Sequence, residues 1–518
     1  MTSTRHPDET FLHARVAAAQ GDFATMQQLG LQLHQDWAND ANRLLQLGKL
    51  WQQSGFLAHA QHCFDRAHAL APADVAPLAG LARVATDRAQ HALASALYQQ
   101  LLQAAPHNLA IRRNALLSME YDLDATPAAR KKAAVDWAHQ AKAQATSQAS
   151  STPAPHQRGG RLRVGYVSAD FCQHTVGLLV KDVLAQHNRE QFDIFAYSAG
   201  QVKDWVTEQI RKTCVWRDVS RMSDTELVQQ IRNDQIDVLV DLSGHTAGSR
   251  LSVFIHRPAP VQLSWLGYFA TTGLDAMDAV LLDEWHAPPG TEAQFVEKIV
   301  RLPCGRLPYQ PVPWAPEPSP PPSLRKGYIT FGSFNNTSKL NPQVLQVWAE
   351  VLKAVPDSRL LLKWRTFNDA EYRETLTQQF AQAGIDPERL ELRGPSFHNQ
   401  VLDEYADMDI ALDPFPFTGG QTSCEALWMG VPVITWPQER VISRQTLALL
   451  AVMNRGEWIA HSTRDYVDRA SQLANNPTQL VQARTSLRQE MQKCAFTQPK
   501  VIAQALEQAY VQGLINAP

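Results

Sequence analysis

The sequence is poor in the features that mark secreted, membrane-spanning and polyanion-binding proteins. Its 518 residues include only six cysteines, far apart and with no C-x-x-C pair, so we expect neither a disulfide framework nor a thiolate zinc site. No run of about 18 apolar residues occurs, and MTSTRHPDETFLHARV lacks the apolar core of a signal peptide. The net charge of −3 creates no basic field. We therefore expect a soluble, cytoplasmic protein that binds neither nucleic acid nor membrane.

The chain is long enough for about three domains at roughly 150 residues each, and a hydrophobic content of 44% is enough to form their cores. Within residues 1–125, marker residues recur every 34 positions. The markers are Ala60 and Ala94, Phe64 and Tyr98, Pro72 and Pro106, and the small residues Gly21, Gly55 and Ala89.

This pattern resembles tetratricopeptide repeats, in which helix pairs bury their faces only by stacking into a solenoid. The alternative is an ordinary all-helical domain with an accidental period. One more helix is predicted from Thr126, which can cap it ahead of Pro127. A flexible linker of small residues follows, so that helix and linker together occupy residues 126–160.

From residue 161 the pattern changes to short apolar runs that alternate with helical stretches. Runs such as RLRVGYVS, IDVLVDLSG and YITFGSF suit strands that are buried on both faces of a parallel sheet. A proline-rich connector at 308–326 separates two halves, 161–307 and 327–518. The predicted fold is an α-helical repeat domain followed by two Rossmann-like, doubly wound α/β domains on either side of a hinge. Ligands of such folds bind beyond the carboxyl ends of the strands.

The most informative loop lies in residues 411–436, ALDPFPFTGGQTSCEALWMGVPVITW, which predicts a strand, a glycine-rich turn, a short helix and a strand. Thr422 can cap the helix, whose first amides would then face an anion. Glu425, one turn further, could accept hydrogen bonds from two ribose hydroxyls. The alternative is a capping box in which Glu425 only returns to the Thr422 amide. The candidate donor-binding residues here are Gly420, Gln421, Thr422, Ser423 and Glu425.

A counter-charge for a diphosphate is available from Lys339. It lies in the polar loop of TFGSFNNTSKLNP, after a predicted strand, where an ammonium group could stabilise a departing diphosphate. A solvated loop lysine is the alternative. The acidic pair Asp407 and Asp409 looks like a metal-holding D-x-D, but it precedes the strand DIALD instead of following one. We therefore expect no metal, with Lys339 and helix amides as the counter-charge.

Two histidines follow predicted strands of the first α/β half. His174 lies in VGYVSADFCQHTVG after the first strand, and His245 lies in VLVDLSGHTAG after the third. Both are candidates for proton transfer or for a hydrogen bond to a phosphate or sugar, the alternative being a structural role. Asp241 is expected to cap the turn at its strand end.

Together these segments resemble the tetratricopeptide-repeat protein O-glycosyltransferases, the family of O-GlcNAc transferase and the plant SPINDLY proteins. The motifs are GYVSADF, DLSGHTAGSR, RPAPVQLSWLGYFATTG, TFGSFNNTSKLNP, LQVWAEVLKAVPDSRL and TSCEALWMGVPVIT. The resemblance implies a GT-B arrangement and inverting, metal-independent and cofactor-free transfer of a sugar from a nucleotide sugar to Ser or Thr of a protein. It also implies contacts of Lys339 with the diphosphate, Thr422 and Ser423 with the phosphates, Glu425 with the ribose and His174 with the sugar.

The sequence departs from O-GlcNAc transferases around the donor. Where they have a His-Thr-Thr run, this chain has Gln421, Thr422 and Ser423. Their uracil-stacking histidine aligns with Val401. His398, one turn away, is a candidate contact for the nucleotide base. The Thr-Ser-Cys-Glu run and GHT are closer to SPINDLY, whose plant members use GDP-fucose. UDP-GlcNAc is therefore the leading donor, and GDP-fucose is the alternative.

The acceptor is expected to be a protein held by the helical repeats, on a Ser or Thr hydroxyl or on an Asn nitrogen. His174 is the favoured general base, although it could equally hold the sugar. Nucleotide-sugar epimerases and phosphorylases share the GT-B fold, but they need no peptide-binding repeats. A protein of another class, an inactive repeat scaffold, is the remaining alternative.

Overall fold

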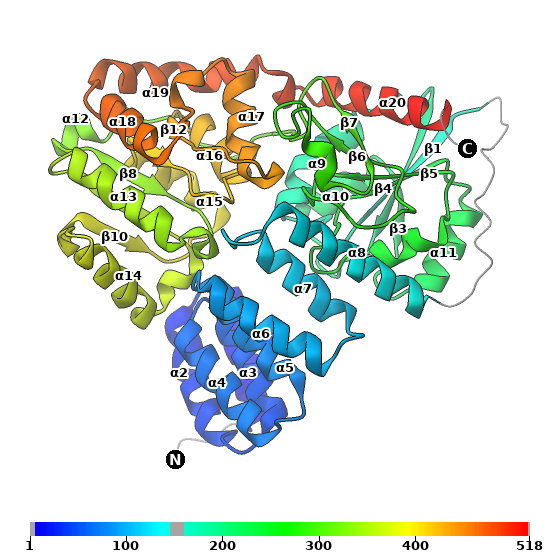
Figure 1. The fold of residues 1–518 in the computed structure, drawn as a ribbon, viewed down its shortest axis with the longest axis horizontal. Coiled ribbons are helices and arrows are strands. Elements are labelled where there is room, and N and C mark those ends of the chain that lie inside the picture. Colours follow the sequence, from blue (N-terminus) through cyan, green and yellow to red (C-terminus); the bar gives the residue numbers. More distant parts are fainter. Residues whose placement is uncertain (1–5, 146–159, 516–518) are drawn as a thin grey trace. The chain divides into compact units, whose positions relative to one another are not determined.

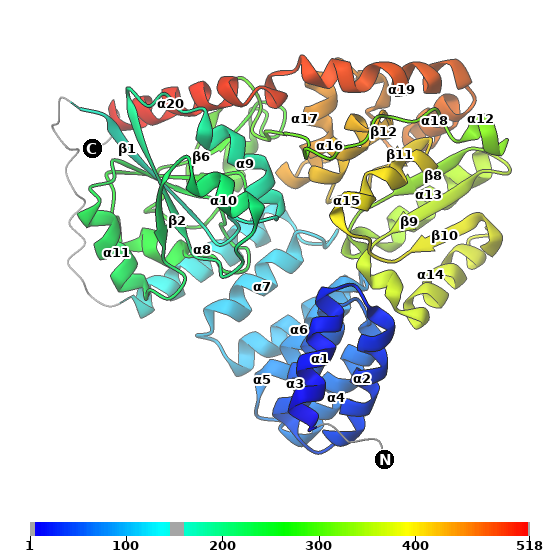
Figure 2. The same cartoon turned by 180° about the vertical axis from the view of Figure 1, so that it is seen from behind.

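The computed structural model describes residues 6–145 and 160–515, which divide into two compact units (Figures 1 and 2). The first unit combines residues up to 111 with 314–436 and 457–487, and the second combines 112–313, 437–456 and those from 488 onward. Most of the predicted linker falls outside the described residues. Within the described ranges, no helix is both long enough and apolar enough to cross a membrane.

The first unit begins with three helix pairs that repeat every 34 residues, as predicted (Figure 1). At the turn of each pair the small residue has a left-handed backbone, with φ of +75° at Gly21, +88° at Gly55 and +57° at Ala89. The amide that follows each of them returns to the first helix over 2.9 Å and closes its end. The helices are α1 (Pro7–Ala19), α2 (Phe23–Asp36), α3 (Ala41–Gln53), α4 (Leu57–Leu70), α5 (Val75–Asp87) and α6 (His91–Ala104).

Close packing of the repeats depends on small residues that face aromatic ones. A Cβ added at Gly48 or Gly80 would lie 2.6 Å or 2.8 Å from the Phe64 ring. Phe64 itself is fully buried. The aromatic side chain therefore fills the groove that the glycines leave open.

The same unit contains a parallel five-stranded sheet with the order β10-β9-β8-β11-β12. Its strands are β8 (Thr330–Ser333), β9 (Arg359–Lys363), β10 (Leu390–Arg393), β11 (Ile410–Leu412) and β12 (Val433–Ile434). Its helices are α12 (Ser323–Lys326), α13 (Pro342–Ala354), α14 (Ala370–Gln382), α15 (His398–Val401), α16 (Gln421–Trp428) and α18 (Thr463–Ala474), with the short 3-10 turns η3 (Thr337–Lys339) and η4 (Arg365–Asn368). Helix α19 (Pro477–Gln492) spans the boundary between the units.

The second unit is built around a parallel sheet (Figure 2). The sheet has seven strands in the order β3-β2-β1-β4-β5-β6-β7. Its strands are β1 (Leu162–Ser168), β2 (Phe192–Ser198), β3 (Val215–Asp218), β4 (Val238–Asp241), β5 (Val261–Trp265), β6 (Ala279–Leu282) and β7 (Lys298–Arg301). Its helices are α8 (Pro127–Gln144), α9 (Thr175–Ala185), α10 (Trp205–Arg211), α11 (Asp224–Asn233), α17 (Gln445–Val452) and α20 (Pro499–Ile515). Helix α7 (Leu109–Met119) begins in the first unit and ends in the second.

Both sheets confirm the predicted doubly wound α/β class. In each sheet the strand order reverses between the first and fourth strands, β1 and β4 in one and β8 and β11 in the other. This switch point is where such folds bind their ligands. The two edge strands β3 and β7 were not predicted, and β3 precedes β4 in the chain, so His245 follows the fourth strand and not the third.

Candidate functional site

Lys339 follows β8 and lies beside the switch point of the five-stranded sheet. Its Nζ donates to Asn335 Oδ1 over 2.8 Å and to Thr418 O over 3.0 Å, and it lies 4.5 Å from the centre of the Phe417 ring. No described carboxylate lies within 4.0 Å of the ammonium group. Burial lowers the pKa of Lys339 to about 8, an effect that the Asp413 carboxylate partly offsets. Lys339 is therefore a cation whose direct partners are all neutral.

The glycine-rich turn brings the start of α16 to the same place. Thr422 Oγ1 donates to Asn335 Oδ1 over 3.1 Å, the same oxygen that Lys339 contacts. Gly419 packs closely against the start of α16, because a Cβ at this position would lie 2.3 Å from Ser423 Oγ. The first amides of a helix have no acceptor within the helix. The helix start and the ammonium group thus converge on one polar spot, as an anion site requires.

Thr422 does not cap α16, which corrects the prediction. The N-cap residue is Gly420, and no side chain caps this end of the helix. A capping box would need Thr422 as the N-cap, whereas the helix begins with Gln421. The Glu425 carboxylate instead accepts from Gln421 Nε2 over 3.0 Å.

Glu425 lies on the buried side of α16 and is 7% exposed. Burial raises its pKa to about 7, against hydrogen bonds from Gln421 and Tyr405. Gln421 Oε1 is also buried and has no partner in the described part of the chain. Buried acceptors of this kind are costly unless a donor satisfies them. A small cavity at the switch point is lined by, among others, Asn335, Asp413, Thr422 and Ser423.

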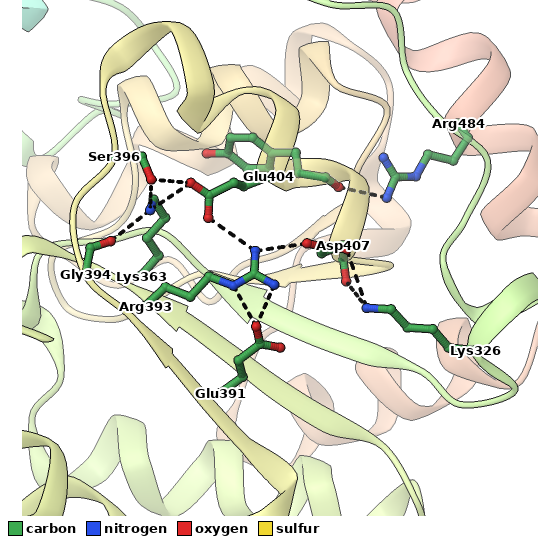
Figure 3. Close-up of polar contacts among 10 residues, drawn as sticks. Lys326, Lys363, Glu391, Arg393, Gly394, Ser396, Glu404, Asp407 and Arg484 are labelled. Carbon is green, nitrogen blue, oxygen red and sulfur yellow. Dashed lines mark hydrogen bonds and ion pairs between the residues drawn. The ribbon is translucent and has the colours of Figure 1, made fainter.

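The Tyr405 hydroxyl lies 3.2 Å from Thr422 O. Tyr405 stands beside a network of charged side chains, which Figure 3 shows. Glu404 accepts from Lys363 and Ser396, and it pairs with Arg393 over 3.2 Å. Figure 3 also shows Arg484, which donates to the backbone carbonyls of Tyr405 and Met408. The network fixes the loop ahead of β11, and with it the position of Tyr405 beside α16.

The acidic pair that resembles a metal motif is engaged in the same region. Asp407 pairs with Arg393 over 2.9 Å and with Lys326 over 3.6 Å. Asp409 accepts from the backbone amides of Ser323 and Thr330. The pair precedes β11, as predicted, and its carboxylates serve structural contacts. No group of three or more potential metal ligands occurs among the described residues.

His174, in the second unit, follows β1 and forms the N-cap of α9. Its Nδ1 accepts from the Val176 amide over 3.3 Å and lies 3.7 Å from Asp170 Oδ2. The side chain is 51% exposed. An Nδ1 that accepts a hydrogen bond leaves the proton of the neutral ring on Nε2. The exposed nitrogen of His174 is therefore a donor in this arrangement.

His245, which follows β4 in the same unit, is buried at 1% exposure. Its Nε2 donates to Thr272 O over 2.8 Å, and its ring packs edge-on against Trp137 and Tyr268. Burial lowers the pKa of His245 to about 4. These surroundings favour a packing role, so a catalytic His245 stays a prediction without support from its contacts. Asp241 caps the strand-end turn as expected, accepting from the amides of Ser243 and Gly244.

The structure brings Lys339, Thr422 and Glu425 together in the first unit, whereas the two histidines belong to the second. His398 begins the short helix α15, and its side chain lies outside the described residues. Asn335, which joins Lys339 to Thr422, was missed. The available signal was its position directly after β8, in the same loop as Lys339.

A family model described as Glycosyl transferase family 41 matches residues 118–305 and 323–506. One relative is the probable UDP-N-acetylglucosamine–peptide N-acetylglucosaminyltransferase SPINDLY of Petunia hybrida, 38% identical over 68% of this chain and 38% of the relative. Another is the corresponding probable transferase SEC of Arabidopsis thaliana, 30% identical over 68% of this chain and 37% of its own length. The chain spans less than half the length of these curated relatives.

Among solved structures, a lysine-to-methionine mutant of the Thermobaculum terrenum O-GlcNAc transferase is similar along the whole chain. The two are 31% identical, the match covers 99% of each chain, and the TM-score is 0.87. The similarity therefore includes the helical repeats as well as both sheets.

Proposed function

This chain belongs to glycosyltransferase family 41, and on that basis we propose that it transfers a sugar from a nucleotide-sugar donor to a protein. The observation that carries the proposal is the meeting of Lys339 and the start of α16 at one oxygen of Asn335. This arrangement offers a positive charge and the positive end of a helix to a diphosphate.

In the proposed complex the donor diphosphate lies across Lys339 and the start of α16. The diphosphate would supply the anionic partner that Lys339 lacks among its direct contacts. Lys339 would then stabilise the charge that develops on the departing diphosphate. Glu425 and Gln421 Oε1 are acceptors for the hydroxyls of the ribose. Lys339 and the helix start provide the counter-charge, so we propose transfer without a metal. The resemblance to the protein O-glycosyltransferases supports inversion at the sugar and, as the acceptor, a Ser or Thr hydroxyl of a protein held by the repeats.

His174 is proposed to contact the sugar or the acceptor. The geometry supports donation from Nε2, because Nδ1 already accepts from the amide of Val176. A hydrogen bond from His174 therefore has more support than proton abstraction by it, and the general base stays unassigned.

UDP-GlcNAc is the leading donor, and GDP-fucose is a second candidate. The second candidate is favoured by Val401, which stands where O-GlcNAc transferases have a uracil-stacking histidine. Thermal-shift measurements with both sugar nucleotides and with UDP and GDP would separate them, because a ligand that binds only the native state raises its melting temperature.

Replacing Lys339 with alanine tests the function. We expect turnover, measured as transfer to protein or hydrolysis of the sugar nucleotide, to fall at least about 100-fold while circular dichroism and Tm are kept. Lys353→Ala is the matched control, since Lys353 is exposed on α13. Activity of the Lys339 variant within about threefold of wild type would remove the leaving-group role. A wild-type protein that consumes neither donor would favour the inactive scaffold.

A further inference from the structure

The turn that carries Lys339 is packed against the helical repeats, within the first unit. Thr337 Oγ1 donates over 2.8 Å to the backbone carbonyl of Asp87, the last residue of α5. The last carbonyls of a helix have no partner within the helix, so Thr337 caps α5. Thr337 and Ser338, the two residues before Lys339, are 0% and 1% exposed.

The Asp87 side chain makes a second set of contacts with this region. It is 1% exposed, and its carboxylate accepts from Gln52 Nε2 over 2.8 Å and from Ser338 Oγ over 3.5 Å. The guanidinium groups of Arg83 and Arg365 each lie 3.6 Å from it. One buried carboxylate therefore joins α3 and α5 of the repeats to η3 and η4 of the α/β domain.

The other two repeat turns meet neighbouring loops of the same sheet. A Cβ at Gly21 would lie 3.0 Å from the Phe397 ring, which follows β10, and a Cβ at Gly55 would lie 2.0 Å from the carbonyl oxygen of Arg365, which follows β9. The turns after α1, α3 and α5 thus face the loops after β10, β9 and β8. We call this row of contacts, between the repeat turns and the three loops, the repeat seam.

Asp369 strengthens the repeat seam by capping one helix on each side of it. Its carboxylate accepts from the Ala58 amide at the start of α4 over 2.6 Å and from the Tyr372 amide of α14 over 2.9 Å. The neighbouring Asn368 donates to Ser54 O over 3.0 Å. The repeats cannot shift along the sheet without leaving these buried or half-buried groups unpaired.

The repeat seam therefore determines where Lys339 points. In η3 the Asn336 side chain accepts from the Ser338 amide over 3.1 Å, so Thr337, Ser338 and Lys339 form one short turn. Two of its side chains are held by the end of α5, and the third reaches Asn335 and Thr418 on the other side.

We propose that Asp87 is a positioning residue for Lys339, so that the helical repeats complete the diphosphate site in addition to any role in acceptor binding. The catalytic meaning of this inference rests on the proposed function. A purely structural Asp87 would stabilise the repeats without affecting the surroundings of Lys339, and the two roles differ in measurable ways.

The test uses full-length Asp87→Ala and Thr337→Val, with Thr337→Ser as the conservative variant. Asp74→Ala is the matched control, because Asp74 caps the opposite end of α5 through the Ala76 amide. We would measure kcat, the donor KM, Tm, and the pH dependence of Lys339 acylation by acetic anhydride, followed by mass spectrometry. The last measurement reports the ionisation of Lys339 without requiring turnover.

We expect Asp87→Ala and Thr337→Val to lower kcat at least about tenfold with less than about threefold change in donor KM. Their Lys339 acylation midpoint should rise from near 8 towards the ordinary lysine range, as the ammonium group becomes more exposed to water. Thr337→Ser should behave as wild type, and Asp74→Ala should lower Tm alone.

An unchanged acylation midpoint in both Thr337→Val and Asp87→Ala would overturn the inference, as would an equal loss of kcat in Asp74→Ala at the same Tm. If Asp87→Ala does not fold, Thr337→Val decides, because it removes a single hydroxyl. A wild-type protein that uses no donor would refute the proposed function, while the acylation midpoints would still support or overturn the positioning role.

Discussion

Burial shifts the pKa values of Glu425 and Lys339, two ionisable residues of the proposed donor site, towards each other. It raises the pKa of Glu425 to about 7 and lowers the pKa of Lys339 to about 8. Both shifts disfavour the charged form, as expected where water is excluded. The proposed function needs both charges, since the carboxylate accepts from the ribose and the ammonium group stabilises the diphosphate. Both charges coexist mainly between the two values.

We therefore expect kcat/KM for the donor to be bell-shaped, with limbs near pH 7 and pH 8. Below the first value Glu425 is protonated and loses acceptor capacity, and above the second Lys339 loses its charge. Initial rates from pH 5.5 to 9.5 check this. Glu425→Gln should remove the acidic limb and weaken donor binding, and a flat profile in the wild type would contradict both roles.

Ala89 is the one repeat-turn marker that is not glycine. At φ +57° the Cβ of Ala89 is strained, which costs about 1–2 kcal/mol of stability. A glycine would remove this strain, although its greater freedom in the unfolded chain would cancel part of the gain. We expect Ala89→Gly to raise the free energy of unfolding by up to about 1 kcal/mol in urea titrations. Gly55→Ala is the opposite case and should be destabilising, because of φ and of the nearby Arg365 carbonyl. A less stable Ala89→Gly variant would contradict this account.

At the candidate site, sequence patterns predict which residues follow a strand. They do not predict which residue caps a helix or how a side chain packs. The placement of Lys339 and Glu425 is predictable, because each comes after a strand, on the side of the sheet where such folds bind ligands. The cap of α16 is not, because Thr-x-x-Glu has the same spacing whether the helix begins at Gln421 or further on. The enclosure of His245 by Trp137 and Tyr268 depends on tertiary packing.

Among the elements, the loop between α7 and α8 depends on an arginine that is distant in sequence. Arg440 is 7% exposed and donates to five backbone carbonyls at 2.5–3.3 Å, all within the second unit. Burial lowers its pKa to about 10, so it remains charged at neutral pH. The carbonyls belong to Met119, Glu120, Asp122, Leu123 and Ala125.

Arg440→Ala should cost about 3 kcal/mol or more, because it leaves several partly buried carbonyls without a donor. Urea unfolding followed by circular dichroism measures this. Arg440→Lys should recover only part of the loss, since an ammonium group has fewer donors in a different geometry. Arg464→Ala is the control, its side chain being 84% exposed. A loss no greater than that of the control would show that the loop holds without Arg440.

The missed strands have a common reason. β3 and β7 are four-residue strands at the two edges of the seven-stranded sheet, and neither has a buried residue. Strands covered on both faces have the continuous apolar runs that made β1, β4 and β8 predictable. These two edge strands lack that pattern, so sequence alone does not separate them from loops.

For the chain as a whole, sequence order does not show which segments fold together. Residues 437–456 and those from 488 onward group with the seven-stranded sheet, although they follow the five-stranded one. Helix α20 is tied to β1 by a 2.7 Å hydrogen bond between the hydroxyls of Tyr510 and Tyr166. Such pairings join residues more than 300 positions apart, which local patterns cannot reveal.

Leu506→Ala tests this grouping. Leu506 is fully buried in α20, which contacts α9 and β5, so the substitution should cost about 2–5 kcal/mol. We expect hydrogen exchange, measured by mass spectrometry, to increase in β1, β4 and β5 and to change little in β8–β11. Equal loss of protection in both sheets would mean that the two units unfold as one.

The repeat seam fixes which repeat turn faces which loop of the five-stranded sheet. In an ordinary array, one 34-residue unit can be deleted or duplicated anywhere because each unit contacts only its neighbours. Here each repeat turn meets a different loop, so deletion of the α3–α4 unit would bring the turn after α1 to the loop after β9 and leave the loop after β10 without its partner. We therefore expect additional units to be accommodated ahead of α1, where they would leave the register of these three contacts unchanged.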